Sequence, residues 1–158
     1  MKKKVRVVVA DEGSARFYDL ISLQEPLQPF DDLVDHRAHL HDRDFKSDRP
    51  GRVFDHAAAA GARRGSVGHH ATGGDRRPRQ HEAEQFARRI IDALEAGRRA
   101  GGFQALVLMA GPPFLGVLRA AMPAALRAVV TAEVHKDLVH EGEQAVRAHL
   151  PPDAFPLG

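Results

Sequence analysis

One long interruption in the hydrophobic pattern does most to limit the folds open to this chain. From His36 to Gln80 no apolar repeat persists, and Gly, Arg, His and Ala dominate. A compact domain has few uses for a loop of this length, and such a loop is usually disordered or functional. At 158 residues the chain is long enough for one real hydrophobic core. We therefore expect a single domain over residues 1–158, with a long charged loop over residues 36–80 between two ordered parts.

The part before the interruption predicts strands. Val5–Ala10 is rich in β-branched residues and ends at a polar turn, and Ser14–Ser22 follows as a second strand, so the two should pair as a hairpin. Pro26 and Pro29 confine any third strand over residues 27–35 to an edge of the sheet or to the part after Phe30. This order predicts an N-terminal antiparallel meander.

The part after the interruption alternates helices and strands. Residues 81–100 carry apolar side chains at three- and four-residue spacing, which predicts a helix with one buried stripe. The stripe consists of Ala83, Phe86, Ala87, Ile90, Ile91 and Leu94. Strands are expected at residues 105–110 and 128–135, a broken helix after Gly111, and a last helix at residues 141–150. The fold class is α/β, with a mixed sheet and packed helices, and the arrangement suits the ribonuclease-H-like group of folds.

Positive charge is concentrated in the interruption. Residues 36–81 hold ten Arg or Lys against five Asp or Glu, although the net charge of the chain is only +2. Such an excess can attract an anionic partner, such as RNA, phosphate or an acidic protein surface. The same composition also fits a solvated loop without a partner. Arg76, Arg77 and Arg79 are the binding candidates in the second half of this segment.

The run Ser47–Arg52 offers a second group of candidates. Asp48 can bond its own backbone and Pro50-Gly51 favours a tight turn, so the run fits a structural loop whose arginines pair with neighbouring carboxylates. Alternatively, the arginines form an anion clamp on an exposed face. The candidates for that clamp are Arg16, Arg43, Asp48, Arg49 and Arg52.

The sequence predicts no catalytic residue, metal or cofactor. No cysteine is present, and His81-Glu82-Ala83-Glu84-Gln85 lacks the second histidine of a zinc-protease helix. Two alternatives stay open. One is a metal site formed by His36, His39, His41, Asp42, Asp44 and Asp48. The other is a nuclease site in which Asp11, Glu133 and Asp137 converge on the sheet.

The chain resembles the bacterial host attachment protein family over nearly its whole length. The matching segments are Ala10-Asp11 with Ala15-Arg16-Phe17, Ser47–Asp55, His81–Ala87, Leu106–Ala110 with Phe114–Arg119, and Lys136-Asp137-Leu138. The resemblance implies a role in attachment to host cells and no known active site. We expect a cytoplasmic protein without membrane insertion, because no export signal or membrane-spanning segment is apparent. The resemblance also implies a non-enzymatic protein that acts through an unknown protein partner. Its oligomeric state is open.

A remoter resemblance points to the central domain of archaeal and eukaryotic peptide release factors. Gly73-Gly74-Asp75 is similar to the Gly-Gly-Gln loop of that domain, and Phe86-Ala87-Arg88 is similar to a step in the helix that follows it. Asp75 stands in the place of the glutamine, and a carboxylate would repel a developing oxyanion. The resemblance therefore implies an RNA- or ribosome-associated factor without peptidyl-tRNA hydrolysis as the alternative function.

Overall fold

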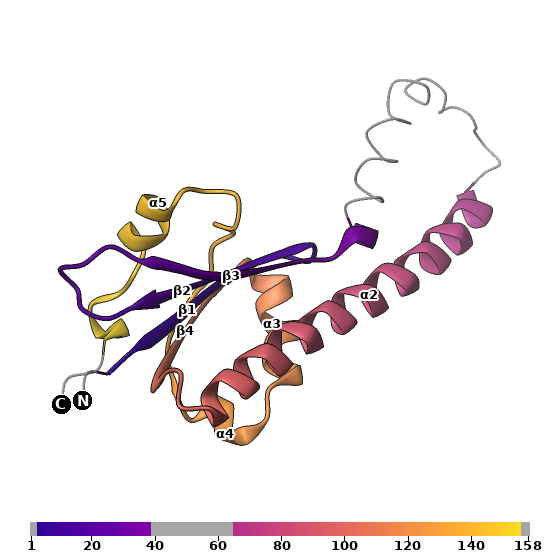
Figure 1. Ribbon diagram of the computed structural model, residues 1–158. Coiled ribbons are helices and arrows are strands. Elements are labelled where there is room, and N and C mark those ends of the chain that lie inside the picture. The colour runs from indigo at the N-terminus through magenta and orange to yellow at the C-terminus, as the bar shows by residue number, and fades with distance from the viewer. Residues whose placement is uncertain (1–2, 39–64, 156–158) are drawn as a thin grey trace.

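Five strands form one mixed sheet in a computed structural model that describes residues 3–38 and 65–155, with side chains described at 3–38 and 78–155. The sheet order is β3-β2-β1-β4-β5. The strands are β1 (Val5–Ala10), β2 (Ser14–Leu20), β3 (Gln28–Val34), β4 (Ala105–Ala110) and β5 (Val130–Val134). β1 pairs antiparallel with β2 and parallel with β4, so it joins the N-terminal meander to the C-terminal half (Figure 1).

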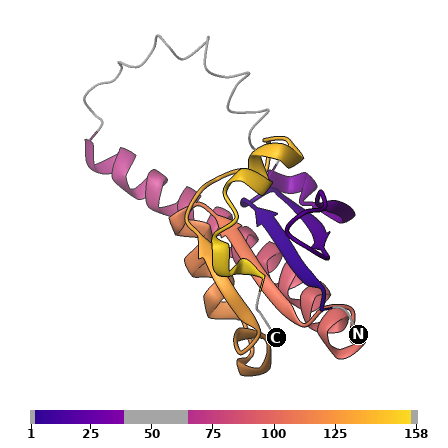
Figure 2. The ribbon, with the colours of Figure 1, turned by 90° about the vertical axis from the view of Figure 1, so that its left-hand side faces the viewer.

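Helices cover both faces of the sheet. They are α2 (Gly65–Arg99), α3 (Pro112–Ala121), α4 (Ala124–Arg127), α5 (Glu143–Ala148) and the 3-10 helix η2 (Pro152–Ala154). α2, α3 and α4 pack on one face, while α5 and η2 lie on the other (Figures 1 and 2). The predicted α/β class and mixed sheet are therefore confirmed.

β1 and β4 form the centre of the core because each is buried along its whole length. Val8 and Leu108 point to the face covered by α2, where the predicted helical stripe, including Phe86 and Ile90, meets them. Val7 and Val107 point to the opposite face and join the cluster of α5. Continuous apolar runs are typical of parallel strands that are covered on both faces.

Of the two alternatives for the third strand, the edge position is confirmed, and the strand is not restricted to the part after Phe30. β3 lies at one end of the sheet and includes Pro29, which stands opposite Tyr18. Proline lacks a backbone N–H and is tolerated at an edge, where one side of the strand has no partner. The pairing skips Phe30, which forms a bulge and leaves this ring 57% exposed.

The predicted loop over residues 36–80 was too long. Residues 65–80 form the first turns of α2, so the helix begins at Gly65 and not at His81. The glycines and Pro78 in this stretch have low helix propensity, so the sequence does not predict a helix there. Extending an existing helix costs much less than nucleating one, so the amphipathic part after His81 can support the turns before it. The remainder of the predicted loop, residues 39–64, lies outside the described residues.

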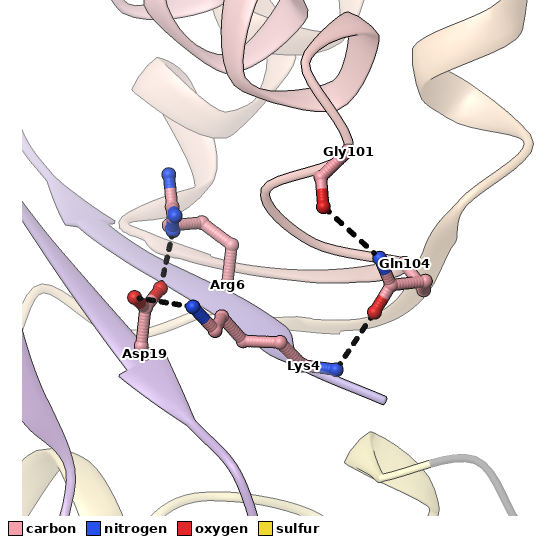
Figure 3. A network of polar contacts seen from close by, with 5 residues as sticks. All are labelled: Lys4, Arg6, Asp19, Gly101 and Gln104. Carbon is pink, nitrogen blue, oxygen red and sulfur yellow. Dashed lines mark hydrogen bonds and ion pairs between the residues drawn. The ribbon is translucent and has the colours of Figure 1, made fainter. Parts of the chain in front are cut away.

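A buried ion pair joins β1 to β2 within the meander (Figure 3). Arg6 of β1 is 3% exposed, and its Nε lies 2.6 Å from Oδ1 of Asp19 on β2. Its guanidinium carbon lies 3.8 Å from the ring centre of Phe30 and 4.9 Å from that of Phe103, which follows α2. The Nζ of Lys4 adds a weaker contact to Asp19 at 3.8 Å. The positive charge is thus held by one carboxylate and two aromatic faces.

Candidate partner-binding surface

The predicted candidate residues fall into three groups. Arg16 is exposed on β2, and Arg79 is exposed on α2. Arg76 and Arg77 lie on the same helix, in the stretch whose backbone alone is described. The other four candidates lie outside the described residues; they are Arg43, Asp48, Arg49 and Arg52. The structure therefore does not decide between a structural loop and an anion clamp for the Ser47–Arg52 run.

Arg16 does not share a face with the α2 arginines. Its neighbours Ala15 and Phe17 pack in the cluster under α2, while Tyr18 packs in the cluster on the α5 side. Because successive side chains of a strand point to opposite faces, Arg16 lies on the α5 side of the sheet. The structure therefore does not bring Arg16 together with Arg79.

The N-terminal part of α2 extends beyond the sheet (Figures 1 and 2). Among residues 78–99, whose side chains are described, Ala83 is the first buried residue, and the side chains of residues 78–81 are exposed. Gly73-Gly74-Asp75 lies inside this helix and not in a loop, which corrects the placement expected from the release-factor resemblance. Phe86 and Ala87 of the second matching segment are buried core residues.

An open groove of about 490 Å³ lies between α3, α4 and the edge strand β5. Phe114, Leu115 and Leu118 hold α3 against the sheet, and the chain then turns at Pro123 to begin α4. This break leaves space between the end of α3 and β5. The residues that line the groove are Arg119, Ala120, Met122, Arg127, Val130 and Glu133. We call it the β5 groove.

Arg119 and Glu133 form the principal ion pair of the β5 groove. Arg119 donates from Nε to Glu133 Oε1 at 3.1 Å, and its Nη2 donates to the same oxygen. The hydrogen bond from Arg119 lowers the pKa of Glu133 from its ordinary value, and the same bond raises the pKa of Arg119. Both groups therefore stay charged near neutral pH.

Arg127 adds a second cation to the groove. It is exposed on α4, and its Nη2 donates to the backbone oxygen of Arg119 at 3.1 Å. The same oxygen also accepts from the backbone N–H of Met122 at 3.2 Å, so Arg127 adds a second donor to a carbonyl group at the end of α3. With two guanidinium groups and one carboxylate, the lining carries a net charge of +1.

β5 is the outer strand on this side of the sheet. Its pairing with β4 skips Thr131, so this residue forms a bulge, and its hydroxyl donates to the backbone oxygen of Ala154 at 3.1 Å. The bulge turns Val130 towards the groove, on the same face as Glu133. Over residues 3–38 and 65–155, the outer backbone groups of β5 bond to no other strand.

The described residues do not form the catalytic or metal site that the sequence left open. Glu133 pairs with Arg119, while Asp11 accepts from the backbone N–H groups of Gly13 and Ser14 and lies 3.3 Å from Nε2 of His140. Within the described part of the chain, no group of three or more His, Asp or Glu could hold a metal ion. His36 is exposed, and the other residues of the predicted histidine-rich metal site lie outside the described ranges.

Sequence reasoning missed Arg119 and Arg127, and it considered Glu133 only as a nuclease carboxylate. The available signal was the helix break at Pro123, with one arginine in the turn before it and another in the turn after it. A pair of cations on two short helices is a weak signal, because surface arginines are common.

The comparison with protein families accounts for nearly the whole chain. A family model described as a protein required for attachment to host cells matches residues 6–150, from β1 to beyond α5. No curated protein matches the chain. No helix in the described part of the chain is long and apolar enough to cross a membrane.

Proposed function

The chain belongs to the family of proteins required for attachment to host cells, and from this premise we propose that it supports attachment inside the cell by binding a partner protein, without catalysing a reaction. The observation that carries the proposal is the N-terminal extension of α2 beyond the sheet. A role in binding requires an accessible surface, and the helix backbone leads away from the sheet here, with exposed side chains at residues 78–81 (Figure 1).

The composition of the extension favours a partner that covers it. Residues 65–80 of α2 contain four glycines and Pro78, and each glycine costs about 1 kcal/mol relative to alanine in a helix. Most helical stability in proteins comes from packing, and the backbone of α2 before residue 78 extends beyond the sheet (Figure 1). Contacts with a partner would supply the missing stabilisation.

The charge of the extension indicates the kind of partner. Residues 65–80 hold Arg76, Arg77 and Arg79 against one acidic residue, Asp75. A surface with this excess of guanidinium groups fits an acidic protein surface, to which arginine can make paired hydrogen bonds. Binding should weaken as salt is added.

The proposal is tested with a charge-reversal variant, Arg76→Glu/Arg77→Glu/Arg79→Glu. The wild-type protein should retain its partner on an affinity column, and the variant should lose both the partner and the ability to restore host attachment to a deletion strain. A matched control, Lys3→Glu/Arg88→Glu/Lys136→Glu, changes the same charge at exposed basic residues elsewhere. Equal losses in the two variants, or full attachment by the first, would contradict a specific role for the extension.

Nuclease treatment separates this proposal from an RNA- or ribosome-associated role, which the basic extension would also suit. The RNA- or ribosome-associated role would fit a ribonuclease-H-like or release-factor-like fold, which we propose for the mixed sheet together with that role. If nuclease releases everything that the protein retains, the alternative is favoured. Peptidyl-tRNA hydrolysis is not expected under either proposal, because Gly73-Gly74-Asp75 is part of a helix and carries a carboxylate.

Location is tested separately by proteolysis of intact cells. The native protein should be protected from an external protease and become sensitive after lysis. A secreted or surface-bound pool that is digested in intact cells would exclude the intracellular part of the proposal, whatever the partner is.

A further inference from the structure

We propose that the β5 groove is a second binding site, which takes an extended acidic peptide as an added strand on β5. The site lies on α3, α4 and β5 and is separate from the α2 extension. Strand addition is a common mode of peptide recognition, in which main-chain hydrogen bonds give affinity and side-chain pockets give specificity. The β5 groove offers both components side by side.

The two edges of the sheet differ in how well they admit another strand. β3 contains Pro29 and the exposed carboxylates of Asp31 and Asp32, which are features that block edge pairing. β5 has no proline or lysine, and three of its five residues, Val130, Thr131 and Val134, are β-branched. Its single carboxylate, Glu133, is turned onto the groove and bonded to Arg119. Of the two edges of the described sheet, β5 is therefore the better suited to accept a strand.

The charge of the groove selects the occupant. Alternate residues of an added strand point to the same face, so every second side chain of a bound peptide would face the groove. Arg127 is exposed there, and Glu133 engages only Nε and Nη2 of Arg119, which leaves Nη1 to donate. Carboxylates at alternate positions can accept from both guanidinium groups.

A second copy of the chain fits this edge less well. Pairing of β5 with the β5 of another molecule would bring two grooves together, each with a net charge of +1. Like charges across a contact oppose association. The acidic peptide is therefore the occupant that the charges favour.

The first experiment measures binding of short labelled peptides to the full chain by fluorescence anisotropy. A peptide that alternates Val and Glu should bind, and peptides of equal length that alternate Val with Gln or Lys should bind at least about tenfold more weakly. N-methylation of the Val-Glu peptide at alternate residues provides the matched test of strand addition. One alternate set of methyl groups should abolish binding and the other should leave it unchanged, because only one set of N–H groups faces β5.

The second experiment changes the protein. Arg127→Glu should weaken the Val-Glu peptide at least about tenfold, while Arg88→Glu, the same change on the exposed side of α2, should leave it unaltered. Glu133→Gln should tighten binding, because it releases Arg119 from its own carboxylate. Arg127→Gln replaces Arg127→Glu if the charge-reversed chain does not fold.

Several outcomes would overturn the proposal. They are no binding at about 1 mM peptide, equal binding of the Glu and Lys peptides, or tolerance of both sets of N-methyl groups. Weaker binding to Glu133→Gln would show that Glu133 recognises the ligand and would also contradict it. Dimerisation through β5 that competes with the peptide would assign the edge to a second copy instead. None of these results bears on the α2 extension, so this site and the proposed function fail independently.

Discussion

Arg6 and Arg119 place the same guanidinium group in two different environments. Arg6 is 3% exposed and is enclosed by Asp19 and two aromatic rings, whereas the side chain of Arg119 is 48% exposed and meets Glu133 at the rim of a groove. Breaking a buried pair leaves an uncompensated charge without water, while an exposed pair contributes less than about 1 kcal/mol. We therefore assign a structural role to Arg6 and a role in recognition to Arg119.

Asp19→Asn should destabilise the protein by about 2–4 kcal/mol, because Arg6 would keep its charge in a buried position with a neutral partner. The free energy of unfolding in urea measures the effect. Asp92→Asn, on the exposed side of α2, is the matched control and should change it by less than about 0.5 kcal/mol. Equal effects at the two positions would show that the Arg6 pair adds nothing.

The Arg119–Glu133 pair should contribute to the loss of stability in acid. The hydrogen bond from Arg119 holds the pKa of Glu133 below its ordinary value of 4.5. The folded state therefore binds fewer protons here than the unfolded state. The contribution is present above about pH 4.5 and is lost as the pH falls through the lower folded-state pKa.

Glu133→Gln should accordingly flatten the acid limb of the stability curve only slightly, because the pair is partly exposed. Arg119→Gln should have a similar effect, and the double variant should flatten the curve no further than either single change. Fully additive effects of the two changes would show that the two groups act independently.

At the scale of the elements, α2 is one helix whose two segments are stabilised in different ways. From Ala83 onwards, an apolar stripe with Ile90 and Leu94 packs on the sheet, so tertiary contacts stabilise the helix. Before Ala83, glycines and Pro78 oppose a helix, and the turns depend on extension from the packed part. The two parts should therefore differ in local stability even though the helix is continuous.

Pro78→Ala should strengthen the extension, because proline removes one backbone hydrogen bond and costs about 3 kcal/mol in a helix interior. Amide hydrogen exchange of residues 65–80 should slow, while exchange of residues 90–99 should stay the same. Ala93→Gly, at an exposed position in the packed part, should accelerate exchange only around its own site. Unchanged exchange before residue 80 in Pro78→Ala would contradict a helix that passes through this proline.

At the scale of the whole molecule, β1 and β4 belong to two hydrophobic clusters at once. Even-numbered residues of both strands face α2 and α3, and odd-numbered residues face α5 and η2. The two clusters are separated only by the backbone of the sheet, so neither can be lost without exposing strands of the other. The described part of the chain should therefore unfold in one transition.

This cooperativity can be tested with one truncation on each face. Ile91→Ala, on the face of α2 that packs on the sheet, should cost about 2–4 kcal/mol. Val107→Ala, on the α5 side, should cost about 2 kcal/mol for the two buried methyl groups it removes. Both changes should lower the midpoint of a single unfolding transition. Far-UV circular dichroism and the fluorescence of Tyr18, the single tyrosine, should give the same midpoint. Two separate transitions in either variant would show that the faces unfold independently.

Local patterns in the sequence were enough to determine the elements of the sheet. Val5–Ala10 and Ala105–Ala110 are strands with the predicted bounds, and Pro29 marks β3 as an edge, because backbone chemistry at these positions leaves few alternatives. The stripe through Phe86 and Ile90 likewise identified the buried face of α2. These are short-range effects, and they can be read without knowing what lies nearby in space.

The tertiary structure alone decided the start of α2 and the existence of the β5 groove. Local propensity opposes a helix before His81, and only its continuity with a packed segment overrides that preference. Arg119 and Glu133 are fourteen residues apart and lie on different elements. They meet because the apolar side chains of α3 fix this helix over the sheet beside β5. Contacts of that kind depend on how whole elements pack, and no pattern within a single element encodes them.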